Sequence, residues 1–82
     1  MKELLNRLAE ATQKANEADT AWESNPESKE LERAFDRAYR AEYKIREALA
    51  AEIVKLAPKI EFKTAVKMTY NPKTIELLAE TV

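Results

Sequence analysis

A basic row on one long segment is the strongest candidate for chemistry in this sequence. Arg33, Arg37, Arg40 and Lys44 follow one another at intervals of four, three and four residues, so they share one flank of a helix. Such a row can follow the phosphates of a nucleic acid. Acidic residues are interleaved with it, in the pairs Asp36–Arg40, Glu30–Arg33 and Lys44–Glu47. Because pairs at this spacing are ordinary on exposed helices, we favour a solvated face and keep nucleic-acid binding as the alternative.

Other residue types that carry catalysis or bind metals are scarce. The chain has no histidine and no cysteine, which excludes disulfides, thiolate metal sites and the commonest general base. It has no glycine, which excludes a glycine-rich phosphate loop. Ser24 and Ser28 have no evident base beside them, and the acidic residues lack the spacing of a calcium-binding loop. We therefore expect no enzymatic activity and no cofactor, metal or small-molecule ligand.

The length and charge of the chain set further limits. Its 82 residues suit one small domain, and such domains usually rely on disulfides, a metal or a second subunit for stability. Only self-association or partner binding remains available here. The 14 basic and 15 acidic residues nearly cancel, which disfavours attraction to nucleic acid or anionic lipid. The opening residues lack the pattern of a signal peptide and no apolar run approaches the roughly 20 residues that span a bilayer, so we expect a cytoplasmic protein without membrane association.

Two long helices are expected to position the basic row. Apolar residues recur at three- and four-residue spacing near the start of the chain, which predicts a helix over about residues 2–23. Asn25 is a favoured helix cap and Pro26 suits a first helical turn, so a second helix is expected over about residues 26–57. The short connection makes the two helices antiparallel neighbours, with small alanines facing each other as in a coiled coil.

The chain after the second helix changes to a period-two pattern. Over about residues 60–70, apolar and polar residues alternate and β-branched and aromatic types are common, which favours a half-buried strand. One alternative is a third helix that presents Phe62, Ala65, Val66 and Thr69, and another is an irregular segment packed on the hairpin. A lone strand has no partner within the chain, so it would pair with a second copy or with another protein.

The expected architecture is a mainly α single domain over residues 1–82. Asn71 followed by Pro72 repeats the cap-and-proline signal and predicts a short final helix over about residues 72–80. In this arrangement, residues 1–57 form an antiparallel helical hairpin and residues 58–82 form a tail that docks on it or dimerises.

The second helix has more apolar surface than the first can cover. It extends about ten residues further, or roughly 15 Å, and it carries a second apolar edge rotated away from the alanines. Aromatic residues on a part-exposed ridge are typical interface anchors, although the tail is an equally good cover for them. We therefore expect a small structural or interaction protein that forms a homo-oligomer or binds another protein. The expected interface residues are Phe35, Tyr39, Tyr43, Ile53, Ile60, Phe62, Val66 and Met68.

Two carboxylates and one tryptophan are placed close to the seam between the helices. Glu42 and Glu52 are expected to reach water from the edge of the seam, because a buried unpaired carboxylate is unfavourable. The alternative is a polar contact that fixes register or meets a second subunit, and Arg7 and Lys14 are candidate charge partners. Trp22 is expected to close the core beside the turn.

Overall fold

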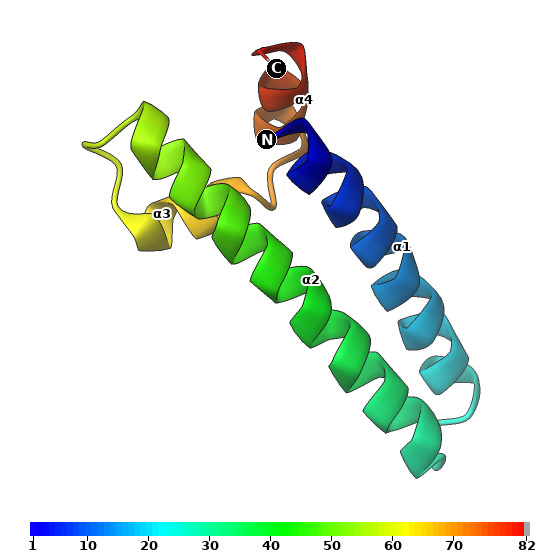
Figure 1. Cartoon of the computed structure of the whole chain (residues 1–82). Helices are drawn as coiled ribbons and strands as arrows, with labels where there is room; N and C mark the ends of the chain where they lie inside the picture. The colour runs from blue at the N-terminus through cyan, green and yellow to red at the C-terminus, as the bar shows by residue number, and fades with distance from the viewer. Residues whose placement is uncertain (82) are drawn as a thin grey trace.

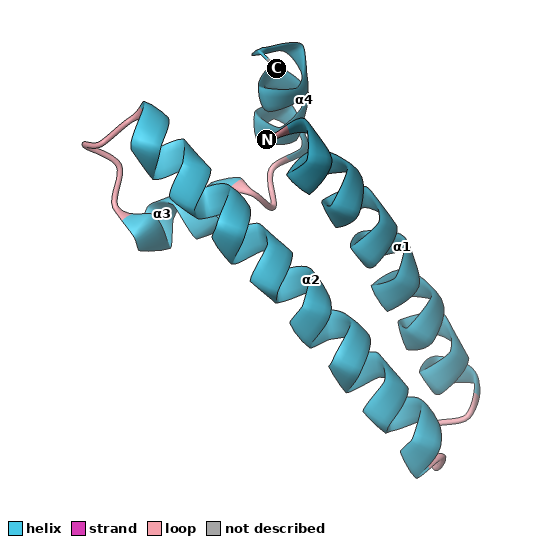
Figure 2. Cartoon of the chain, in the orientation of Figure 1, coloured by secondary structure: helices cyan, strands magenta, loops and turns pink. Residues whose placement is uncertain are grey.

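The computed structural model describes residues 1–81, which form four helices joined by short loops (Figures 1 and 2). The helices are α1 (Lys2–Ser24), α2 (Lys29–Leu56), α3 (Phe62–Met68) and α4 (Pro72–Thr81). The two long helices that the sequence predicts are confirmed, and α1 and α2 lie antiparallel along an elongated molecule of 44 × 22 × 18 Å. No helix within residues 1–81 combines the length and the apolar character that crossing a bilayer requires.

Small side chains line the seam between α1 and α2. Leu8, Ala11 and Ala15 are buried on α1, and Ala11 shares a groove with Ala38 and Ile45 of α2. Alanine at such positions lets two helix axes approach more closely than leucine does. The described backbone contains no residue with positive φ, which agrees with a chain built without glycine.

The start of α2 differs from the prediction. Residues 25–28 form a turn in which the Ser28 N–H donates to the Asn25 carbonyl at 3.1 Å. The Ser28 hydroxyl then accepts a hydrogen bond from the Leu31 N–H at 3.2 Å, so Ser28 is the N-cap and α2 begins at Lys29. The prediction of Asn25 as the cap and of a helix from Pro26 is wrong, because the proline belongs to the turn.

The strand predicted over residues 60–70 is also wrong, because residues 62–68 form α3 and the chain up to residue 81 contains no strand. A single strand would leave its backbone N–H and C=O groups unpaired, whereas a helix pairs most of them internally. The buried residues Ala65, Val66 and Thr69 lie on one face of this segment. The alternative of a third helix therefore describes it.

The tail covers much of the apolar excess of α2. One core cluster joins α2 to α3, while Leu49 of α2 is completely buried. Its buried members are Ala50, Ile53, Ala65 and Val66, and Val54, Ile60, Met68 and Leu78 pack against them. The cover is incomplete, since Leu56 and Phe62 remain 64% and 46% exposed at the corner between the two helices.

The last helix is attached more lightly than the others. The predicted start of α4 is confirmed, and the Asn71 side-chain oxygen accepts a hydrogen bond from the Lys73 N–H at 2.9 Å. No residue of α4 within the described chain is buried, and Leu77 is 63% exposed. The helix projects beside the start of α1 at the end of the molecule that holds both termini (Figure 1).

Candidate interaction surface

A row of aromatic rings runs along α2 from the hairpin turn. The ring centroids of Trp22 and Phe35 are 5.4 Å apart, and those of Phe35 and Tyr39 are 6.0 Å apart. Trp22 and Phe35 are half-buried, whereas Tyr39 and Tyr43 are 48% and 40% exposed. Trp22 thus packs on α2 beside the turn, and its buried indole N–H has no hydrogen-bond partner among the described residues. The row passes from packed rings to rings that are open to solvent.

The position of α3 explains why these tyrosines are exposed. The core that α3 shares with α2 starts at Ala50, and α3 itself ends at Met68. The N-terminal half of α2 therefore has α1 on one side and no helix in the position that α3 occupies further along (Figure 1). Tyr39 lies on this half of α2 and Tyr43 directly follows it, before the core shared with α3 begins at Ala50.

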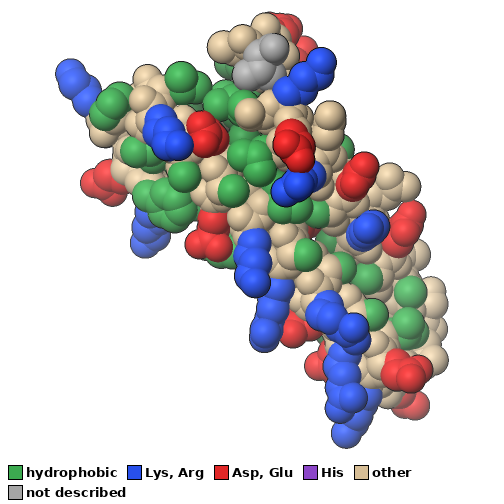
Figure 3. Space-filling model, viewed as in Figure 1, with side chains coloured by type: hydrophobic (Ala, Val, Ile, Leu, Met, Phe, Trp, Pro, Cys, Tyr) green, Lys and Arg blue, Asp and Glu red, His purple; other side chains and the backbone are tan. Residues whose placement is uncertain are grey.

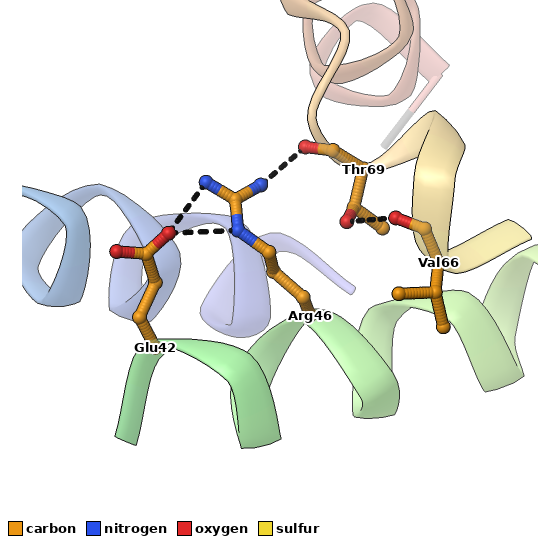
Figure 4. Close-up of polar contacts among 4 residues, drawn as sticks. All are labelled: Glu42, Arg46, Val66 and Thr69. Atoms are coloured by element: carbon orange, nitrogen blue, oxygen red, sulfur yellow. Dashed lines mark hydrogen bonds and ion pairs between the residues drawn. The ribbon is translucent and has the colours of Figure 1, made fainter. Parts of the chain in front are cut away.

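A buried polar junction lies where the tail begins to cover α2 (Figure 4). The Arg46 guanidinium contacts Oε1 of Glu42 through Nε and Nη2, each at 2.8 Å, and its Nη1 donates to the backbone carbonyl of Thr69. The Arg46 and Glu42 side chains are only 9% and 11% exposed. The Thr69 hydroxyl donates to the Val66 carbonyl at 2.6 Å, so it too has a partner. The charges and polar groups of this junction satisfy one another within the chain.

Tyr70 extends the junction toward the aromatic row. The Arg46 Cζ atom lies 4.0 Å from the centroid of the Tyr70 ring, a cation–π contact. Partial burial raises the pKa of the Tyr70 hydroxyl above its ordinary value of 10.0, and Tyr39 and Glu42 raise it further while Arg46 lowers it. The hydroxyl is therefore neutral at physiological pH.

Arg46 is a residue that the apolar pattern does not single out. The signal that points to it is its position four residues after Glu42, a spacing that brings an acid and a base together on one helix. The predicted partners from α1 are not used by Glu42, and Arg7 instead pairs with Glu3 at 2.9 Å on the exposed surface. Glu52 is half-buried and pairs with Lys55 at 3.3 Å.

The basic row of α2 is exposed, and Lys and Arg side chains gather along the free flank of this helix (Figure 3). Of its three predicted ion pairs, only Asp36–Arg40 is present in the described chain, at 3.2 Å. Arg33, Arg37 and Lys44 have no acidic partner within 4 Å in residues 1–81.

The expected interface residues separate into buried and exposed groups. Ile53 and Val66 belong to the core between α2 and α3, and Ile60 and Met68 pack against that core. The exposed members are Tyr39, Tyr43 and Phe62, while Phe35 is half-buried in the aromatic row.

Within the described chain, no group of three or more acidic, histidine or cysteine side chains is arranged to hold a metal ion. On α2, the exposed side chains of Tyr39 and Tyr43 are flanked by charged residues. Comparisons of the chain with protein families, with curated proteins and with solved structures each find no match.

Proposed function

We propose that the chain is a non-enzymatic interaction protein that associates with itself or with another protein through the exposed aromatic part of α2. The observation that carries this proposal is the exposure of Tyr39 and Tyr43 on the part of α2 before Ala50, where its core with α3 begins. Tyrosine anchors interfaces well because its ring buries a large area with little loss of side-chain freedom. A domain of this size also gains stability when association covers apolar surface.

The corner between α2 and α3 supports the same proposal. Leu56 and Phe62 come close together in the chain on either side of a short loop and are among its most exposed large apolar residues. Apolar side chains exposed at neighbouring positions are typical of contact sites. We assign this corner a secondary contribution to binding.

The test is the mass of the intact protein in solution, measured by light scattering over the micromolar range. We expect a mass above that of the monomer, and a return toward the monomer in a Tyr39→Ala/Tyr43→Ala variant. Leu77→Ala is the matched control, because it removes a similarly exposed apolar side chain from α4. A wild-type protein that stays monomeric throughout would contradict self-association.

One observation favours a second candidate, a nucleic-acid-binding accessory role. Arg33, Arg37 and Lys44 are exposed and carry no acidic partner among the described residues, so they are available to phosphates. This role predicts binding to DNA or RNA that weakens steeply with salt and is lost in an Arg33→Glu/Arg37→Glu variant. The absence of any mobility shift at low salt would eliminate it.

A further inference from the structure

One face of α2 remains open along both halves of the helix. Tyr39, Arg40, Tyr43, Lys44 and Glu47 line a single open hollow on it. Further along, the face continues through residues that α3 leaves uncovered, and these are Ala48, Ala51 and Lys55. Most of these side chains are exposed, and Glu47 is half-buried. A partner helix therefore has access to the middle of α2 and to both of its ends.

The residues of this face are arranged so that two antiparallel copies of α2 would complement each other about a point between Tyr43 and Lys44. Arg40 and Glu47 are equally far from that point and carry opposite charges. Glu32 and Lys55 repeat the charge match nearer the ends of the helix. The point lies within about one residue of the middle of α2, so two antiparallel α2 helices centred on it would overlap along almost their whole length.

We propose that two copies of the chain pair through this face, with their α2 helices antiparallel about a two-fold axis that crosses α2 between Tyr43 and Lys44. Arg40 then faces the partner's Glu47, and Glu47 faces the partner's Arg40, which is how a two-fold interface repeats each contact. Tyr43 lies against the partner's Lys44, a cation–π arrangement. This inference rests on the proposed self-association and gives it a surface and a register.

The charges select the antiparallel arrangement over the parallel one. In a parallel two-fold pair each residue meets its own copy, so Arg40 would face the partner's Arg40 and Lys44 the partner's Lys44. Like charges placed opposite each other are strongly unfavourable in an interface. Arg40 already contacts Asp36 at 3.2 Å, which orients its guanidinium, whereas Lys44 and Glu47 have no ion-pair partner in residues 1–81. Between two copies Glu47 gains a charge partner in Arg40, and Lys44 gains an aromatic partner in Tyr43.

The test uses charge reversal in the intact protein. Arg40→Glu alone and Glu47→Arg alone each place like charges opposite each other twice, so each should raise the dimer dissociation constant by at least about tenfold. The Arg40→Glu/Glu47→Arg double variant restores opposite charges and should dimerise like the wild type. An equimolar mixture of the two single variants should form a heterodimer, because both carboxylates of the first variant then face guanidinium groups of the second. Native mass spectrometry distinguishes this heterodimer from either homodimer.

Controls and alternative outcomes separate this inference from the proposal on which it rests. Lys73→Glu, a charge reversal at an exposed position of α4, is the matched control and should leave the dimer unchanged, and circular dichroism checks that every variant is folded. Single variants that dimerise as well as the wild type would overturn this register while leaving self-association through another surface intact. Single variants that weaken dimerisation but do not form a heterodimer when mixed would also overturn it. A wild-type protein that is monomeric throughout would overturn both proposals.

Discussion

The Arg46 guanidinium donates a hydrogen bond to the backbone carbonyl of Thr69, and this contact joins α2 to the turn between α3 and α4. The same guanidinium holds Glu42 and lies over the Tyr70 ring. One buried cation thus satisfies a carboxylate on its own helix and fixes the tail on the hairpin.

Removing Arg46 should destabilise the protein strongly. Arg46→Ala leaves the Glu42 carboxylate buried without its partner, and breaking a buried pair in this way typically costs about 3–5 kcal/mol. Urea unfolding followed by circular dichroism measures the loss. A Glu42→Leu/Arg46→Met variant should recover most of the stability, because it removes both charges together. Arg7→Ala, at an exposed pair, should change stability by less than about 1 kcal/mol.

Truncating Leu49 should show how strongly the structure depends on the buried side of α2. Leu49 is fully buried, so Leu49→Ala should lower the free energy of unfolding by about 2–5 kcal/mol through lost apolar burial and a cavity. Leu56, the last residue of the same helix, is 64% exposed, so Leu56→Ala should change that free energy by less than about 0.5 kcal/mol. Chemical denaturation of both variants measures the difference. Equal effects at both positions would contradict the packing described for α2.

Two serines at the hairpin turn should behave differently. Ser28→Ala removes the side chain that caps α2 and should cost about 1 kcal/mol of stability. The Ser24 hydroxyl only donates to the Thr20 carbonyl within α1, in an exposed position, so Ser24→Ala should have an effect within about 0.5 kcal/mol. Thermal unfolding of the two variants makes the comparison. A loss for Ser28→Ala no larger than that for Ser24→Ala would contradict Ser28 as the N-cap of α2.

Tyr70 should ionise above the ordinary tyrosine pKa when the protein is titrated with base. Its pKa is raised in the folded state, chiefly by partial burial, so the folded protein retains this proton at a pH where the unfolded chain has lost it. The resulting contribution to stability is complete below the ordinary pKa of 10.0 and is lost as the pH rises through the higher, folded-state value. Phenolate absorbance during the base titration should show a phase above the ordinary pKa of 10.0 that disappears in Tyr70→Phe.

The hairpin can be predicted from the sequence, because the pattern that defines each of its helices is local and repeats along the helix. Three- and four-residue spacing of apolar side chains defines α1 and α2, and Pro72 after Asn71 locates α4. The start of α2 is harder to predict, because Asn25 and Ser28 are both good helix caps and the sequence alone does not show which of them is used. A proline near a helix start is compatible with either choice.

The segment over residues 60–70 misleads a prediction from sequence because two periodicities coexist in it. Even-numbered positions are mostly apolar, yet Ala65, Val66 and Thr69 also make a helical face. The helix is favoured because the overhang of α2 gives that face a surface to pack on and because a lone strand lacks a pairing partner. Only tertiary contacts separate these alternatives.

The polar junction is harder to foresee than the aromatic row. Tyr39 and Tyr43 stand out in the sequence as large side chains off the main seam, although only the structure shows that the tail leaves them exposed. Arg46 has its decisive contact with a backbone carbonyl 23 residues away, and no pattern in side-chain types records such a contact. Buried charges of this kind become evident only in the three-dimensional structure.

The light attachment of α4 implies a gradient of local stability along the chain. Because none of its described residues is buried, α4 should open and reclose far more often than the hairpin, and its amide hydrogens should exchange earliest. Leu5 and Leu8 of α1 share a groove with Pro72 and Ile75, so each opening briefly uncovers leucines at the start of the chain. The hairpin thus tolerates transient fraying of its final helix without losing the contacts that Arg46 and the α3 core provide.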